Sequence, residues 1–336
     1  MSDGPALRVS VPSSERQNPM STGRIDVHQH VIPPFYRDWL TGRGIDLGRR
    51  LPAWSTGSTL AMMDGHGIAA GVLSVSTPGV HLAPGEDAEA RRLARRANEF
   101  LAELVKDRPD RFGFFATLTL PDVDGALAEA EYAFDVLGAH GVLLLANTHG
   151  QYLGDPALEP LMAELGRRGA VALVHPSQLP GPAVPGVPAY VADYLLDTTR
   201  AAVNLVRNRV LTRHPGLRVI LAHGGGFLPY ASHRVAHAPN VWGDRTLDQV
   251  LAELRRFHFD TALSSSPAGL PSLLAFADPM NIHYGSDWPF ATDDIDYFLA
   301  GLESHPLDDT TRAAIDRTNS ARLFAGAAFL ESGRSE

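Results

Sequence analysis

The 336-residue sequence contains no cysteine. Disulfide bonds, thiolate metal sites and cysteine nucleophiles are therefore excluded together. Any metal must be held by nitrogen and oxygen ligands. No apolar run approaches the roughly 18 residues that a membrane-spanning helix needs, so no membrane association is expected.

Positive charge is also scarce, since the formal net charge is -9 at pH 7. Such a chain repels phosphate backbones, so nucleic acid is not an expected partner. The first residues are polar and rich in serine and proline, and they lack the apolar core of a signal peptide. We expect residues 1–23 to form a disordered leader and the protein to be cytoplasmic.

Eight short β-rich runs alternate with helix-patterned segments after this leader. Eight parallel strands joined by crossover helices close a (β/α)8 TIM barrel, so residues 24–330 are expected to form one barrel domain. The predicted strands lie at 24–31, 70–76, 111–120, 141–147, 170–176, 218–224, 257–264 and 281–287. Periodicity predicts helices at 86–107, 124–138, 155–168, 190–213, 246–256 and 269–277.

The longest gap between predicted strands, residues 32–66, follows the first strand. In a barrel this segment is a loop on the catalytic face. Its aromatic side chains, Tyr36, Trp39 and Trp54, either wall a substrate pocket or pack the loop against the barrel. Both interpretations remain open from the sequence.

Ionisable residues cluster at the ends of the predicted strands, where buried barrel strands should be almost wholly apolar. His28 and His30 are two residues apart on the first strand, so both imidazoles point to the same side, into the barrel mouth. His175, His223 and Asp287 end the fifth, sixth and eighth runs. Imidazoles with a carboxylate suit Zn²⁺ first, and they also accept Mn²⁺, Fe²⁺ or Co²⁺.

Three consecutive glycines, 224–226, follow His223. A lipase-type oxyanion hole is disfavoured because the chain has no G-x-S-x-G motif. A phosphate-binding turn is disfavoured because no Walker pattern is present. We predict a tight turn between strand and helix that brings the backbone close to the site.

Four motifs carry a family resemblance: D-x-H-x-H from Asp26, L-V-H-P, I-L-A-H-G-G-G-F-L-P-Y and Y-G-S-D-W-P-F. They resemble the amidohydrolase superfamily, and within it the branch of aminocarboxymuconate-semialdehyde decarboxylase and the 2-hydroxybenzoate decarboxylases. The match extends to N-S-A-R-L-F at 319–324. The segments D-T-T-R-A-A (197–202) and F-D-T-A-L-S (259–264) resemble the 6-methylsalicylate decarboxylase-like subgroup.

The resemblance implies a set of roles at matching positions. It implies one divalent metal, with Asp287 also a candidate proton donor and His223 an unliganded acid/base beside a metal-bound water. A two-metal centre is not expected, because the fourth strand ends in L-L-L-A-N-T-H where two-metal relatives carry a carboxylated lysine, and the only lysine is Lys106. The implied metal ligands are His28, His30, His175 and Asp287.

Substrate recognition is predicted less directly. A carboxylate substrate needs cationic partners, and Arg200 and Arg234 lie just beyond the fifth and sixth strands. Arg234 also matches an arginine of the branch. His149 and His233 are further candidate pocket residues. The expected partners are a small-molecule carboxylic acid and further copies of the chain, in a homodimer or higher homo-oligomer.

Two reactions fit these expectations. The first is non-oxidative decarboxylation of an aromatic acid with an ortho hydroxyl, such as 6-methylsalicylate, or of a conjugated carboxylic acid. The second is hydrolysis of a lactone, ester or amide at the same metal, since fold and ligand set do not distinguish the two. A binding protein with a vestigial site is disfavoured because no ligand position is degraded.

Overall fold

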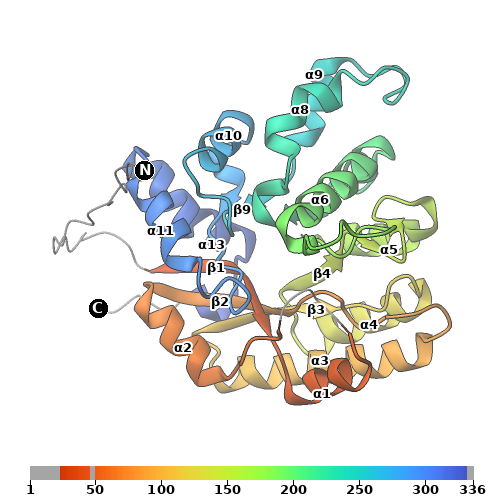
Figure 1. Ribbon diagram of the computed structural model, residues 1–336, viewed down its shortest axis with the longest axis vertical. Coiled ribbons are helices and arrows are strands. Elements are labelled where there is room, and N and C mark those ends of the chain that lie inside the picture. Colours follow the sequence, from red (N-terminus) through yellow and green to blue (C-terminus); the bar gives the residue numbers. More distant parts are fainter. Residues whose placement is uncertain (1–22, 46–49, 331–336) are drawn as a thin grey trace, which may run out of the picture.

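A computed structural model of the protein describes residues 23–45 and 50–330. Eight parallel strands form one sheet in the order β1-β2-β3-β4-β7-β8-β9-β10, with helices around it (Figure 1). The strands are β1 (Arg24–Val31), β2 (Ile68–Val75), β3 (Phe112–Thr117), β4 (Gly141–Leu145), β7 (Val171–His175), β8 (Arg218–Leu221), β9 (His258–Asp260) and β10 (Ile282–His283). Each lies within or beside a predicted run. The predicted leader lies outside the described residues, apart from Gly23.

Backbone hydrogen bonds join the first strand to the segment around the last. Val27 N donates to Tyr284 O at 3.0 Å, and Asp287 N donates to His28 O at 2.9 Å. The sheet therefore closes on itself, and the predicted (β/α)8 barrel is confirmed. The same contacts bring His28 next to Asp287.

Helices cover the outside of the barrel. The predicted ones appear at nearly the expected positions, whereas α1, α2, α8, α11, α12 and α13 lie outside the predicted ranges. They are α1 (Pro34–Gly42), α2 (Thr56–Gly65), α3 (Asp87–Asp107), α4 (Val123–Asp135), α5 (Glu159–Arg167), α6 (Ala189–Arg207), α7 (Val210–Arg213), α8 (Leu228–Ala236), α9 (Leu247–Leu254), α10 (Gly269–Phe276), α11 (Ile295–Ser304), α12 (Asp309–Ala313) and α13 (Asn319–Leu323).

The core has two layers, as expected for a barrel. The outer layer packs the strands against the helices; in α3, for example, Ala94, Ala97 and Leu101 are fully buried on one face. The inner layer contains side chains from the strands and from the C-terminal segment, where Phe324 and Phe329 pack against them. The barrel interior is therefore filled, and the polar groups must gather at the opposite end.

An irregularity in β1 directs the two strand histidines. Asp26 pairs with Gly71 and Gln29 pairs with Leu73, so β1 carries one extra residue between these pairs. Such a bulge changes which face the following side chains occupy. Val27 belongs to the inner apolar layer and His28 still points inward beyond it.

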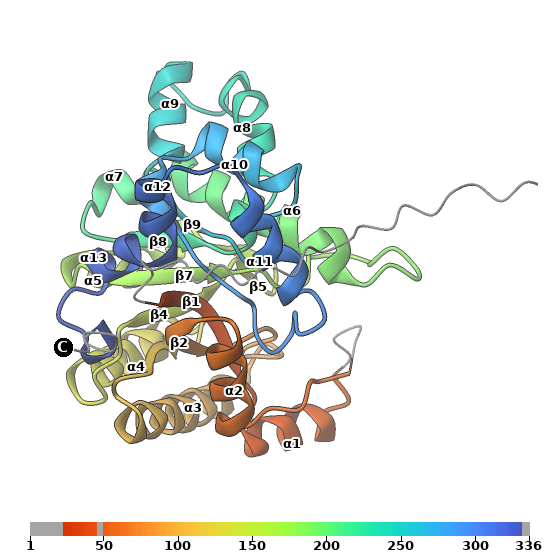
Figure 2. The same cartoon turned by 90° about the vertical axis from the view of Figure 1, so that its left-hand side faces the viewer.

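The loops that follow the strands collect at one end of the barrel. Figure 2 shows α1 and the loop before α6 projecting from the same end of the molecule. A two-stranded hairpin, β5 (Asn147–Thr148) with β6 (Gln151–Tyr152), follows β4. Among the described helices, none combines the length and apolar character needed to cross a membrane.

Candidate metal centre

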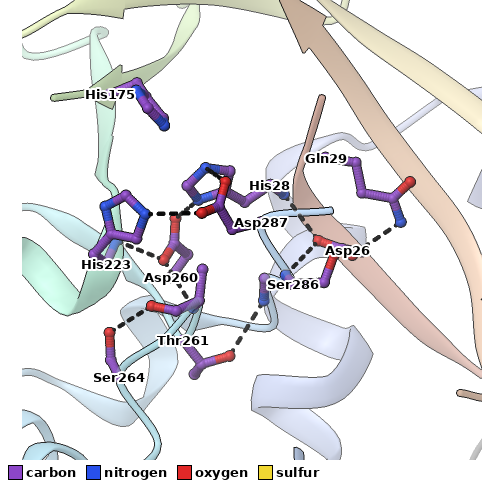
Figure 3. A network of polar contacts seen from close by, with 12 residues as sticks. Asp26, His28, Gln29, His175, His223, Asp260, Thr261, Ser264, Ser286 and Asp287 are labelled. Carbon is purple, nitrogen blue, oxygen red and sulfur yellow. Dashed lines mark hydrogen bonds and ion pairs between the residues drawn. The ribbon is translucent and has the colours of Figure 1, made fainter. Parts of the chain in front are cut away.

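Five ionisable side chains, two from β1 and one each from the ends of β7, β8 and β10, meet at this end of the barrel, and Figure 3 labels four of them. Ligand atoms of His28, His175, His223 and Asp287 all lie within 4.8 Å of one another, and all four residues are buried. His30 joins them, because its Nε2 lies 3.0 Å from His28 Nε2 and 3.2 Å from Asp287 Oδ1. The structure thus brings together every predicted metal ligand and the predicted acid/base.

Hydrogen bonds set the orientation of three of the rings. His28 Nδ1 donates to Asp260 Oδ2 at 2.7 Å, and His175 Nδ1 donates to the carbonyl of Pro176 at 2.8 Å. His30 Nδ1 lies 3.0 Å from Ser74 Oγ, whose own hydrogen goes to the carbonyl of Gln29, so the ring must donate. Each ring therefore presents the lone pair of Nε2 to the centre, which is the arrangement of metal-binding histidines.

Asp287 carries an atom that the protein leaves without a partner. Its Oδ1 is buried and accepts no hydrogen bond. His28 Nε2 and His30 Nε2 lie 3.4 and 3.2 Å from it, but their lone pairs face it. A buried carboxylate oxygen surrounded by imidazole lone pairs needs a cation. The donor set of nitrogen and carboxylate oxygen therefore supports a divalent metal here.

The pKa values of the side chains at this centre are shifted by burial and by their neighbours. Burial lowers the pKa of His30 to about 4 and holds that of His175 well below its usual range. Burial opposes ionisation of Asp287, but contacts with His223 and His30 outweigh it and hold its pKa well below the usual range. His30 and His175 are thus neutral imidazoles beside a charged carboxylate, the forms that bind metal. Burial opposes a charged His28 ring, but Asp260 outweighs it and raises the pKa of His28 to about 9, so a metal would have to displace a proton from this ring.

His223 differs from the other histidines in its position and its bonding. It begins a short 3-10 turn, η2 (His223–Gly225), and has a left-handed φ of 54°. Its Nε2 lies 3.5 Å from Asp287 Oδ2, while its buried Nδ1 has no hydrogen-bond partner. Strained backbone at a non-glycine residue is typical of functional sites. An unpartnered ring nitrogen is free to accept or release a proton.

The glycines after His223 form the predicted tight turn. Gly224, Gly225 and Gly226 all have positive φ. A Cβ on Gly225 would approach the Phe259 ring to 2.8 Å, and one on Gly226 would overlap the carbonyl oxygen of Leu195. Close backbone packing therefore requires glycine at both positions.

Two buried carboxylates behind the centre were not predicted from the sequence. Asp260, at the end of β9, binds the His28 ring and also accepts a bond of 2.8 Å from His223 N. Asp26 Oδ1 accepts from His28 N and Ser286 N at 2.9 and 3.1 Å. Burial raises the pKa of Asp26 to about 6. A carboxylate at the end of an apolar strand was the available signal for Asp260.

A cavity of about 210 Å³, here called the inner cavity, opens at the centre. His175, His223 and Asp287 line one side of it. Tyr194 and Phe290 are among the other lining residues, with Leu195 and Leu263. No arginine or lysine occurs among its described lining residues. The inner cavity therefore suits an aromatic ring beside a metal.

The predicted substrate residues lie apart from the inner cavity. Arg200 is exposed on α6, with Nη1 3.4 Å from Tyr152 Oη, and Arg234 is exposed on α8. Tyr36 is buried and donates to the carbonyl of Gly79 at 2.6 Å. Trp54 is half-buried against Phe100. Tyr36 and Trp54 thus pack the first loop, and a substrate contact by any of the four stays a prediction.

Fold and site together define a metal-dependent barrel enzyme of the amidohydrolase type. The family model described as Amidohydrolase matches residues 25–326. The chain therefore belongs to the amidohydrolase family. This agrees with the resemblance of its four motifs.

The relatives are named decarboxylases. The chain is 36% identical over 312 residues to 6-methylsalicylic acid decarboxylase of Penicillium expansum, covering 90% of this chain and 96% of the relative. It is 30% identical over 285 residues to gamma-resorcylate decarboxylase of Rhizobium sp., covering 79% and 85%. A crystal structure of 2,6-dihydroxybenzoate decarboxylase with 2,6-dihydroxybenzoate is similar at a TM-score of 0.74 and 27% identity, covering 90% and 99%.

Proposed function

We propose that the protein is a metal-dependent, non-oxidative decarboxylase of ortho-hydroxybenzoates, with 6-methylsalicylate-like acids as substrates. The similarity to 6-methylsalicylic acid decarboxylase along nearly its full length carries the proposal. The similarity to gamma-resorcylate decarboxylase supports the same reaction class. Both relatives favour decarboxylation over hydrolysis of a lactone, ester or amide.

We assign the metal to His28, His30, His175 and Asp287. A divalent ion there would act as a template and Lewis acid for the carboxylate and phenolate oxygens of the substrate. Zinc is the first choice, and manganese, iron or cobalt fit the same ligands. Without cationic side chains on the described wall of the inner cavity, the ion is the main anchor for the acid.

The protein must also deliver a proton to the ring carbon that loses CO2. Asp287 Oδ2 and His223 Nε2 are 3.5 Å apart and both residues line the inner cavity. Direct proton transfer needs a separation of about 2.6–3.2 Å, so a small movement of either side chain or one bridging water would let a proton pass between them. Either group can then present it to the ring. Tyr194, Leu195 and Phe290 would hold the ring in place for this transfer and exclude water from it.

We also propose a cytoplasmic location and assembly into a homodimer or higher homo-oligomer. Exposed aromatic side chains at the start of α8 support the assembly, with Tyr230 87% and Phe227 40% exposed. Large exposed aromatic groups are common at subunit contacts. Light scattering during gel filtration measures the oligomeric state directly.

The decisive experiment distinguishes decarboxylation from hydrolysis by the solvent atom that each reaction adds to its product. A decarboxylase places a solvent hydrogen on the vacated ring carbon, whereas a hydrolase places solvent oxygen on an acyl carbon. The metal-loaded protein is incubated in D2O with 6-methylsalicylate and dihydroxybenzoates, and in ¹⁸O-water with lactones, esters and amides. We expect CO2 release and one deuterium at the vacated position.

The Asp287→Asn variant is the control for this experiment, because the metal carboxylate is lost. It should release no CO2 above background. Inert benzoates together with ¹⁸O uptake into acyl substrates would replace the proposal by the hydrolase reaction.

A further inference from the structure

A second and larger cavity adjoins the inner cavity. It measures about 810 Å³ and is here called the outer cavity. Thr77 and Tyr194 line both cavities, so the two meet at these residues. The loop before α6 forms part of its wall, including Val184 and Val187. A group attached to a ring in the inner cavity can therefore extend past Thr77 and Tyr194 into the outer cavity.

The volumes of the inner and outer cavities suit different parts of a ligand. Sites for drug-sized ligands span roughly 300–1,000 Å³. The inner cavity, about 210 Å³, is below this range and suits a single ring with small substituents. The outer cavity, about 810 Å³, lies within it and is much larger than a methyl group requires.

Much of the wall of the outer cavity is aliphatic. Leu82, Leu145 and Leu179 contribute from three different segments, and Ile45 lies among them. Val184 and Val187 also line it and are 61% and 40% exposed. Apolar side chains that face an open cavity gain free energy when a hydrocarbon chain covers them. The wall is thus suited to an alkyl substituent.

One polar arrangement on this wall is built from three residues. His81 is buried, and its Nε2 donates to Asp87 Oδ1 at 2.8 Å. In the neutral His81 ring the Nδ1 atom carries a lone pair, and His149 Nε2, 3.0 Å away, then donates to it. His149 Nδ1 is left as a hydrogen-bond acceptor, and both histidines line the outer cavity.

The position of His149 is itself constrained. It has a left-handed φ of 51° in the β5–β6 turn, where Gly150 N donates to Asn147 Oδ1 at 3.0 Å. Burial lowers the pKa of His149, which favours its neutral form. His149 is exposed on the cavity wall, so its Nδ1 is open to solvent, and a ligand hydroxyl group can take the place of water as the donor to it.

We propose that the outer cavity is a subsite for an aliphatic substituent of the substrate ring that carries a hydroxyl group, which donates to His149 Nδ1. The inference rests on the proposed function, because that function places the ring in the inner cavity. It narrows the substrate class to ortho-hydroxybenzoates with a hydroxylated alkyl chain of several carbons. Asp87 and His81 are positioning residues for His149.

Steady-state kinetics with three kinds of acid test the proposal. The acids are 6-methylsalicylate, 6-heptylsalicylate and a set of 6-heptylsalicylates with a hydroxyl at successive chain positions. We expect kcat/KM to rise from the methyl to the heptyl acid, and again for one hydroxyl position. The second rise should be about tenfold, the effect of one hydrogen bond in a partly buried site.

Two variants separate the alkyl wall from the hydroxyl acceptor. Val184→Trp narrows the outer cavity and should lower the ratio of kcat/KM for the heptyl acid over the methyl acid toward one. His149→Phe keeps the ring but removes the acceptor, so only the preference for the hydroxylated acid should disappear. Val136→Trp and His237→Phe are the matched controls, because both residues are exposed and line neither cavity, and these variants should leave all ratios unchanged.

Equilibrium binding of the same acids to the metal-loaded protein keeps the inference independent of turnover. Tighter binding of the hydroxylated chain that is lost in His149→Phe supports the subsite even if no acid is decarboxylated, in which case the proposed function alone fails. If 6-methylsalicylate is decarboxylated but no heptyl or hydroxyheptyl substituent raises kcat/KM or affinity, the subsite is overturned and the proposed function stands. Equal binding of methyl and heptyl acids to the parent and to Val184→Trp also overturns it.

Discussion

The ring of His28 donates a hydrogen bond of 2.7 Å to Asp260, and both side chains are fully buried. Burial works against a charged ring, but Asp260 outweighs it and raises the pKa of His28 to about 9. The other oxygen of Asp260, Oδ1, accepts a hydrogen bond of 2.8 Å from the backbone nitrogen of His223. The Asp260 carboxylate therefore holds both His28, the proposed metal ligand, and the backbone of His223, the proposed acid/base.

This relationship gives the first prediction. Asp260→Asn keeps the size of the side chain but removes the charge that orients His28. Loss of such an outer carboxylate typically weakens metal binding about 10- to 100-fold. Competition with a chelator measures the affinity, and Asp244→Asn, at a side chain 90% exposed, is the surface control. Equal affinity in parent and Asp260→Asn would show that the carboxylate does not support the metal site.

Much of the site could be predicted because it lies in strands. The His-x-His pair needs only the two-residue period of β1, and His175 and Asp287 follow apolar runs. Closure of the barrel then brings these strand ends together. Asp260 was missed because its role depends on which strand lies beside His28 in space. The sequence alone places β9 next to β10, but it does not say which side chain reaches the ring.

The loop residues were harder to predict for a related reason. Arg200 and Arg234 lie beyond strands of the site, but both are on helices, where rotation by a single residue moves a side chain by 100°. Their helices turn both guanidinium groups to the surface. Tyr36 is in α1, which begins at a proline, and the helix directs its ring into the core. Strand position therefore predicted which side chains come together better than loop composition did.

The metal itself is the subject of the second prediction. Purified protein should contain close to one transition metal per chain, and loading should raise the melting temperature because the ion binds only the folded state. Elemental analysis and thermal unfolding with and without chelator measure both effects. His28→Ala and Asp287→Asn should lose the ion and the thermal shift. A metal content near zero after growth in metal-supplemented medium would contradict the assignment.

His223 should be separable from the ligands. Its Nε2 lies near Asp287, but its Nδ1 is unpartnered, unlike the Nδ1 atoms of the three ligand histidines. His223→Asn should keep the metal and the fold and lose about 10²- to 10⁴-fold in kcat, the range for general acid/base catalysis. Metal content and circular dichroism accompany the rate measurement. If the ion is lost together with the rate, His223 is a ligand and its role must be reassigned.

The turn after His223 predicts a stability difference between two glycines. Gly226 and Gly243 have nearly equal φ, 64° and 65°, but only at Gly226 would a Cβ meet backbone, at the carbonyl of Leu195; nothing lies within 4 Å at Gly243. Gly243→Ala should therefore cost only the backbone strain, about 1–2 kcal/mol. Gly226→Ala should cost more and also shift His223, lowering activity. Urea unfolding compares the two, and equal losses of stability would contradict the steric argument.

A histidine pair on β9 and β10, the half-buried His258 and the buried His283, predicts the response to acid. His258 Nδ1 lies 2.9 Å from His283 Nε2, and burial lowers the pKa of His258 to about 4. An unfolded histidine has a pKa near 6.5, so the unfolded chain binds the proton first, and stability falls as pH falls from about 6.5 to about 4.

The loss from His258 alone can reach about 3 kcal/mol, since one pKa unit corresponds to about 1.4 kcal/mol. Burial also lowers the pKa of His30 to about 4, so the parent must be compared with a variant at each pH. His258→Gln should flatten the fall in the free energy of unfolding between pH 6.5 and 4, measured with urea, whereas His237→Gln, at an exposed position, should not. Parallel curves for the parent and His258→Gln would mean that His258 is already protonated in the folded protein.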